Sequence, residues 1–265
     1  MTRATRRPIF VLLLGSGLGL AACEDKAQQP LAPVASALAS TAPQAARAVR
    51  FVIDAPESQV TFSMQAPLEK ISGEAPGSAS GEIFVDLENV ARSTGLVRVD
   101  LEKLTLFQEK RDDERGTFGA RSNNELQNAH ARTWLEISDD APADVRGANR
   151  FVEFRIDRVE NASHQNLLAL SGAERTIEAD VVGDFRLHGR KNQKRAKVEI
   201  RVRFAGERPE SLSVRTLEPL AIGLEEYDVR PREAFGKLAQ KTLGALGSKV
   251  ATSAAVEIQL RARAE

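Results

Sequence analysis

The sequence predicts an all-β domain of antiparallel strands that follows a targeting segment and a spacer. Seven segments between residues 50 and 265 alternate apolar and polar residues, which is typical of strands with one buried and one solvated face. Cys23 is the only cysteine, so no intramolecular disulfide can stabilise the chain. The domain must therefore be stabilised by a substantial apolar core of its own.

Each alternating segment places its apolar side chains on one face. In 197–204, KVEIRVRF, Val198, Ile200 and Val202 share a face, and charged residues occupy the other. Two packed sheets and a closed barrel both satisfy such a pattern, but only a barrel of about eight strands encloses a ligand-sized cavity. The predicted strands lie within 58–65, 82–87, 96–106, 151–159, 176–189, 197–204 and 255–262.

Two stretches interrupt the alternation. Residues 108–127 are polar and charged, which predicts a long connection with one or two helical turns. Residues 231–250 have an amphipathic helical pattern, with Pro231 suited to the first turn and Gly247 to the end. We therefore expect a helical segment near the C-terminus.

The N-terminus has the features of an export signal. Arg3, Arg6 and Arg7 precede an apolar stretch from Ile9 to Leu20, which is short for a membrane span. Leu20-Ala21-Ala22-Cys23 resembles the lipobox of bacterial lipoproteins, in which the cysteine sulfur receives a diacylglyceryl group. A plain secretory signal with a chance cysteine is the alternative. We expect residues 1–22 to be a signal peptide and Cys23 to be a lipid anchor on the periplasmic side of a bacterial membrane.

Residues 23–49 are rich in Ala and Pro and contain no aromatic residue. This composition favours a flexible tether, and residues 50–265 then form the folded domain.

Charge and motifs exclude several classes of function. The 37 basic and 37 acidic residues balance, whereas nucleic-acid binding normally requires a basic excess. His130, His164 and His188 lack metal-ligand spacing, and the chain lacks a nucleophile elbow. We expect no metal site and no enzymatic activity. The basic run 189–197 fits either a site for anionic lipid headgroups or a solvated turn with Asn192-Gln193 at its tip.

Several motifs together resemble one family. VVGDFRLHGRKNQKRAKVEI (181–200), FVIDAPESQVTFSM (51–64), SGEIFVDLENVARSTGLVRVDLEKLTL (80–106) and SAAVEIQLRA (253–262) are similar, in this order, to segments of the YceI-like lipid- and polyisoprenoid-binding family. The resemblance implies an extended, lipocalin-like antiparallel β-barrel that holds a long apolar amphiphile without a cofactor.

Together with the lipid anchor expected at Cys23, the resemblance favours a membrane-tethered carrier whose ligand is a polyisoprenoid, an isoprenoid quinone or a fatty-acid derivative. The alternative is a structural or adaptor lipoprotein with a filled barrel that acts through its surface. The candidate ligand-binding residues are the inward apolar ones: Phe62, Met64, Ile83, Val85, Val99, Phe154, Ile156, Phe185, Leu187, Ile200 and Val202.

Overall fold

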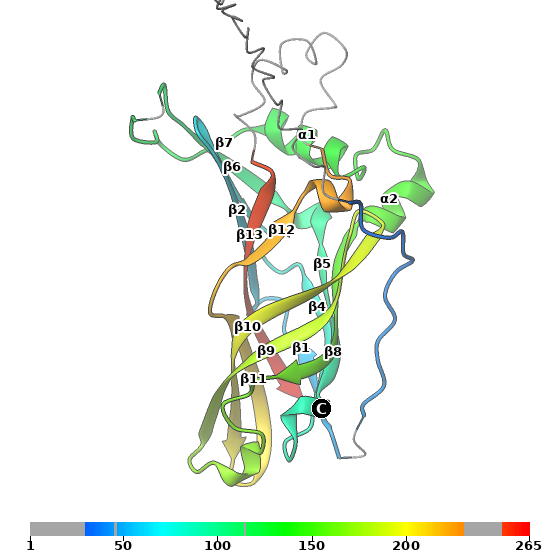
Figure 1. Ribbon diagram of the computed structural model, residues 1–265, viewed down its shortest axis with the longest axis vertical. Coiled ribbons are helices and arrows are strands. Elements are labelled where there is room, and N and C mark those ends of the chain that lie inside the picture. Colours follow the sequence, from blue (N-terminus) through cyan, green and yellow to red (C-terminus); the bar gives the residue numbers. More distant parts are fainter. Residues whose placement is uncertain (1–29, 45–46, 114, 231–250) are drawn as a thin grey trace, which may run out of the picture.

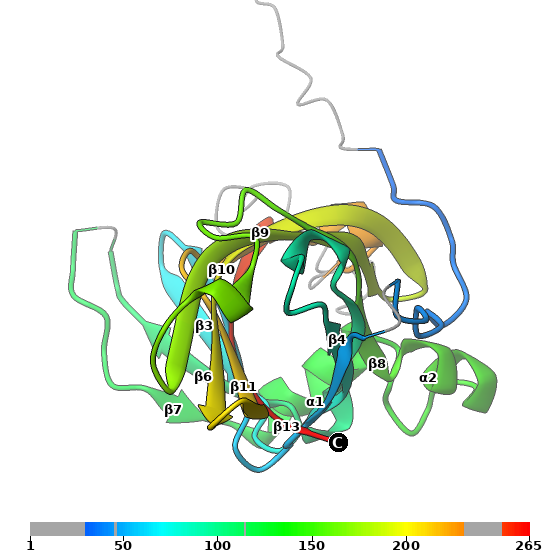
Figure 2. The ribbon, with the colours of Figure 1, turned by 90° about the horizontal axis from the view of Figure 1, so that it is seen from below.

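The computed structural model describes residues 30–44, 47–113, 115–230 and 251–265. Within these ranges, eight antiparallel strands close into a barrel because β1 pairs with both β4 and β13. Seen along its length, the barrel is a ring of strands around a central space (Figure 2). Its strands, in order around the ring, are β1 (Val49–Ile53), β4 (Ala79–Val85), β5 (Thr94–Asp100), β8 (Phe151–Glu160), β9 (Glu174–Leu187), β10 (Arg190–Ala205), β11 (Arg208–Thr216) and β13 (Ser253–Ala264).

Strand β13 joins the barrel to a second group of strands. Its C-terminal half pairs with β1 and β11, and its N-terminal half pairs with β2 and β12. Strands β3, β6 and β7 continue the sheet beyond β2. The all-β barrel expected from the sequence is therefore present. The bounds of these strands are β2 (Gln59–Ala66), β3 (Glu69–Glu74), β6 (Thr105–Lys110), β7 (Ser122–Asn123) and β12 (Leu220–Gly223).

The two ends of the barrel differ (Figure 1). One end, called here the helical end, carries α1 (Glu125–Trp134), α2 (Ala143–Asn149) and the 3₁₀ turn η4 (Glu225–Tyr227). The opposite, far end carries η1 (Val90–Arg92) and η3 (Leu167–Ala169), whereas η2 (Leu101–Lys103) follows β5. Asn124 caps α1 by accepting a hydrogen bond from the backbone N–H of Leu126, as N-cap residues do. Helices α1 and α2 were not predicted, and the helix expected over 231–250 lies outside the described residues.

The turn between β9 and β10 corrects the interpretation of the basic run. His188 and Gly189 form the turn, both with positive φ, so Asn192 and Gln193 lie in strand β10 and not at a tip. Each basic residue of the run has an acidic partner within 3.4 Å. This charge neutralisation weakens the case for a headgroup site there.

Strand β9 lies very close to its paired neighbour β8 at Gly183. The register between the two strands shifts between Ile156 and Arg158, next to the pair Ile156–Gly183. A Cβ atom at Gly183 would overlap the carbonyl oxygen of Arg155. Glycine is required here because the strands bend around the barrel at this bulge.

Residues 30–44, called here the strap, lie along the outside of the barrel and are not a free tether. The backbone N–H of Ala32 donates to the carbonyl of Glu226 in η4 (2.7 Å), and that of Ala35 donates to Gly189 (2.8 Å). The strap then runs toward the far end, where β1 begins (Figure 1). The prediction of a flexible tether was wrong for this part of 23–49, because hydrogen bonds hold it to the barrel.

The strap covers charged residues on the outer face of three neighbouring strands. Glu153 of β8 and Arg186 of β9 are only 1% and 3% exposed, and their side chains pair at 3.4 Å. Arg98 of β5 donates to Glu153 at 2.9 Å. The N–H of Leu38 donates to the same carboxylate at 2.7 Å, and its carbonyl accepts from Arg98 at 3.0 Å. Strap and ion pairs therefore form one buried network.

We predict that Glu153→Ala lowers the free energy of unfolding by about 3–5 kcal/mol, because it leaves Arg186 buried without its counter-charge. Urea denaturation measures the loss. Glu210→Ala is the control, since Glu210 makes only an exposed pair with Arg203, and it should cost less than about 1 kcal/mol. Equal losses of unfolding free energy in the two variants would show that the buried network stabilises the protein no more than an exposed ion pair does.

Candidate functional site

Two apolar cavities lined by residues that the structure describes lie inside the barrel. The helical-end cavity has a volume of about 150 Å³. Side chains from β2, β5 and β8 form its walls, and Ala131 and Trp134 of α1, with Leu135 directly after the helix, cover it. Helix α1 therefore acts as part of the cavity wall at this end.

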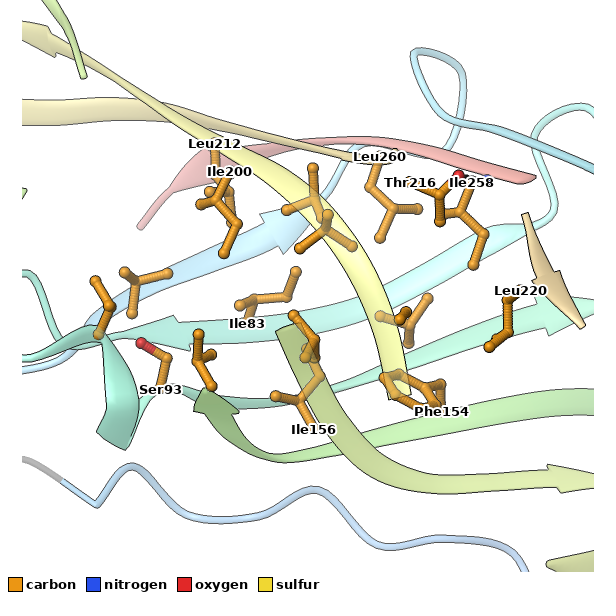
Figure 3. Close-up of a pocket in the computed structure, with 18 of the residues that line it drawn as sticks. Ile83, Ser93, Phe154, Ile156, Ile200, Leu212, Thr216, Leu220, Ile258 and Leu260 are labelled. Atoms are coloured by element: carbon orange, nitrogen blue, oxygen red, sulfur yellow. Dashed lines mark hydrogen bonds between the residues drawn. The ribbon is translucent and has the colours of Figure 1, made fainter. Parts of the chain in front are cut away.

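The far cavity has a volume of about 90 Å³ and lies deeper in the closed part of the barrel. Figure 3 shows Ile83 and Ile156 on one side of this space, with Ile200, Leu212 and Leu260 across from them. Its two polar side chains already have backbone partners: Ser93 accepts from the N–H of Asp86, and Thr216 accepts from the N–H of Ile258. No charged side chain of the described residues lines either cavity.

The structure places ten of the eleven candidate residues on cavity walls. Val202 is the exception, because it is buried in the core but lines neither cavity. Ile83, Val85, Ile156 and Ile200 line the far cavity, and Phe154 and Phe185 line both cavities. The remaining four, on the helical-end cavity, are Phe62, Met64, Val99 and Leu187.

Sequence reasoning missed the contribution of α1. Gln127, Ala131, Trp134 and Leu135 have the spacing of one helical face, which was the available signal. The helix begins at the end of the segment 108–127, which was predicted to be a long polar connection with one or two helical turns.

Four side chains separate the two cavities. Val97, Phe154, Phe185 and Ile258 line both of them, and they are called here the waist. The first three come from adjacent strands, in register as Val97–Phe154 and Phe154–Phe185, while Ile258 belongs to β13. Each cavity is smaller than the pockets of about 300 Å³ or more that hold drug-sized ligands. A long apolar chain therefore requires the waist to open.

Unsatisfied polar groups gather at the helical end. Among the described residues, Gln127 Oε1, Trp134 Nε1 and Tyr227 Oη are buried side-chain atoms without a hydrogen-bond partner, and His188 Nε2 has only the carboxylate of Glu136, 3.1 Å away. Burial, and then the neighbouring Glu226, raises the pKa of Tyr227, so its hydroxyl stays protonated. Buried polar groups normally find partners, so this end has capacity for a polar group that the far cavity lacks.

His188 follows strand β9, and the structure places a polar group near each of its ring nitrogens. The side chain of His188 is largely buried: its Nδ1 lies 3.1 Å from the carbonyl of Tyr227, and its Nε2 lies 3.1 Å from Glu136. Among the residues described, no group of three His, Cys, Asp or Glu side chains is placed to hold a metal ion.

A separate polar depression of about 470 Å³ lies beside the two helices. Arg132, Arg146 and Arg150 share it with Glu102 and Asp139. Arg146 pairs with Asp139 and Arg150 pairs with Glu102, so most of its charge is compensated within the site.

Comparison with known proteins identifies the fold. The family model described as YceI-like domain matches residues 51–264. The chain belongs to the YceI-like domain family. No curated protein matches this YceI-like chain.

Two solved structures resemble the YceI-like chain. One is a polyisoprenoid binding domain from Saccharophagus degradans implicated in plant cell wall breakdown, with 15% identity, TM-score 0.49, and coverage of 82% of this chain and 99% of that one. The other is BcnA from Burkholderia cenocepacia, with 13% identity, TM-score 0.45, and coverage of 79% and 98%.

We predict that Phe154→Ala joins the two cavities and increases the affinity for long-chain more than for short-chain fatty acids or prenols. Removing the ring opens the waist, so a chain that filled only one cavity can extend into the second. Displacement of an apolar fluorophore by a chain-length series measures the effect.

Phe151→Ala is the matched control. Phe151 lies on the same strand, lines neither cavity, and stacks under Arg150 outside. The same change of chain-length preference in both variants would contradict a limiting role for the waist.

Proposed function

We propose that this protein binds the apolar tail of an amphiphile inside its barrel and carries it at a membrane, without catalysis. The observation that supports this most is the pair of cavities on the barrel axis, because both are lined almost entirely by aliphatic and aromatic side chains. Apolar cavities of about 150 Å³ stay dry and accept apolar ligands. An isoprenoid tail has the matching chemistry: it is long, flexible and without hydrogen-bonding groups.

The energetics suit reversible carriage. Burial of apolar surface from water contributes about 25 cal/mol per Å², but a lipid tail that leaves a bilayer is already in an apolar medium. The gain from membrane to barrel is therefore small, and loading and release are both accessible. A site with buried charges would lack this balance, and the described cavity walls contain none.

The ligand would enter tail first, with its polar group at the helical end. The far cavity offers no free hydrogen-bonding group. Trp134, by contrast, lines the helical-end cavity, and its Nε1–H has no hydrogen-bond partner. An indole N–H is a donor only, so it suits a carbonyl, hydroxyl or phosphate oxygen. The family resemblance to polyisoprenoid-binding domains supports an isoprenoid tail.

The proposed membrane location rests on the N-terminal sequence. Cys23 after Leu20-Ala21-Ala22 suits attachment of a diacylglyceryl group, and two acyl chains anchor a protein stably where one does not. The protein would then lie on the periplasmic side of a bacterial membrane. No helix among the described residues is long and apolar enough to cross a bilayer.

We predict that Ala196→Trp prevents uptake of long-chain prenols or quinones. Ala196 lines the far cavity, and an indole there would occupy the space that a tail needs. Lipid extraction and native mass spectrometry of the purified protein measure bound lipid directly.

Ala205→Trp is the control, because it makes the same change at an exposed position of the same strand. A wild-type protein that neither carries lipid nor takes up added quinone or prenol would support the alternative, a filled barrel that acts through its surface.

We predict that Cys23→Ser abolishes the lipid anchor and releases the protein from the membrane fraction. Serine lacks the thiol that accepts the diacylglyceryl group. Intact-mass measurement of the wild-type N-terminus should detect the added lipid, and fractionation should find the variant in the soluble phase. If the mass of the wild-type protein shows no added lipid, the proposed anchor is wrong. The proposal that the barrel binds an apolar tail would not be affected by that result.

A further inference from the structure

The strap gives the barrel a fixed direction relative to its N-terminus. Residues 32–35 hold to the helical end: Ala32 bonds to η4, Arg190 donates to the carbonyl of Ala32 at 3.0 Å, and Val34 forms a bridge with Arg190. Further along, the strap is held by the buried Glu153 network, and Gln44 donates to the carbonyl of Asp157. The chain therefore reaches the barrel at the helical end and leaves the strap toward the far end (Figure 1).

Chain length limits how far the anchor can lie from that end. Cys23 precedes Pro30 by seven residues, which span at most about 25 Å when extended. Strand β9 has 14 residues, so it extends about 46 Å along its length, or about 35 Å along the axis at a tilt near 40°. An anchor at Cys23 therefore reaches the helical end and not the far end.

The exposed apolar side chains are also concentrated toward the helical end. The structure describes four large hydrophobic residues as exposed, and three of them lie at or beside the helical end: Leu31 and Val34 on the strap, and Leu126 on α1. Leu168, in η3, is at the far end. Exposed apolar groups gathered at one end suit contact with a lipid surface.

We infer that the strap holds the barrel with its helical end against the bilayer, so that the end covered by α1 and η4 is the membrane-facing surface. This inference rests on the proposed lipid anchor at Cys23. A free tether of 27 residues would leave the barrel to rotate about 30 Å from the surface; the strap removes that freedom. The helical-end cavity, which Trp134 lines with an unpartnered indole N–H, then faces the lipid headgroups, and a tail enters without crossing water.

The test measures which end of the full-length, lipidated protein lies near the membrane. Leu126→Cys and Leu168→Cys place a label at opposite ends, at positions 62% and 45% exposed. The introduced thiol is the only one free for a fluorophore, because Cys23, the single native cysteine, carries the lipid. The proteins are reconstituted in phosphatidylcholine vesicles with spin-labelled headgroups. We expect several-fold stronger quenching at position 126 than at position 168.

Loosening the strap should remove the difference. Leu38→Asn places an uncharged polar group at a buried strap position, so it weakens docking without a new ion pair. Ser36→Asn makes a matched change at an exposed strap position and should keep the difference.

Each failure has a distinct meaning. Equal or reversed quenching in protein whose lipid is verified by mass spectrometry overturns the orientation alone. Absence of the lipid at Cys23 overturns both the anchor and the orientation. Tail binding is measured separately on the Cys23→Ser protein, so its loss or retention does not enter either result.

Discussion

The pairing of β1 with β13 is the constraint on which the rest of the structure depends. Phe51 to Ile53 pair with Ala264 to Ala262, which joins the beginning of the domain to its end and converts an open sheet into a barrel. Closure gives every strand of the eight-strand ring a neighbour on both sides, so β1 and β4 do not present the free edge that would otherwise invite pairing with other chains. It also turns one face of every barrel strand toward a common axis. The two cavities exist because this axis is enclosed on all sides.

A closed barrel need not be hollow, and the contents of this one depend on how its side chains meet across the axis. At the waist, Phe154 and Phe185 from neighbouring strands approach Ile258 of β13 and divide the space. Away from the waist, the far cavity is lined by short side chains such as Ala196 and Val198. Packing in protein interiors is normally close, so unfilled apolar space on the axis is a feature that a bound tail would complete.

The strap buries charged residues on the outer surface of the barrel. Charged residues that point away from a barrel are normally solvated, yet Glu153 and Arg186 are buried here because residues 30–44 lie over them. Their ion pair is stable in this position because backbone groups of the strap supply further hydrogen bonds, as a buried charge requires. The same contacts set the direction of the N-terminus, so one network links stability to the proposed membrane orientation.

The sequence by itself determined the fold class, the family resemblance and which face of each strand is apolar, because alternation is a local property of the chain. Ten of the eleven candidate residues reached the cavity walls for that reason, whereas Val202 shares the pattern but lies where the core is filled. Tertiary structure alone decided that the barrel closes, where the waist divides it, that α1 covers one end and that the strap docks. Each of these depends on contacts between residues far apart in the chain, such as Leu38 with Glu153 or Phe51 with Ala264, and local periodicity carries no information about such pairs.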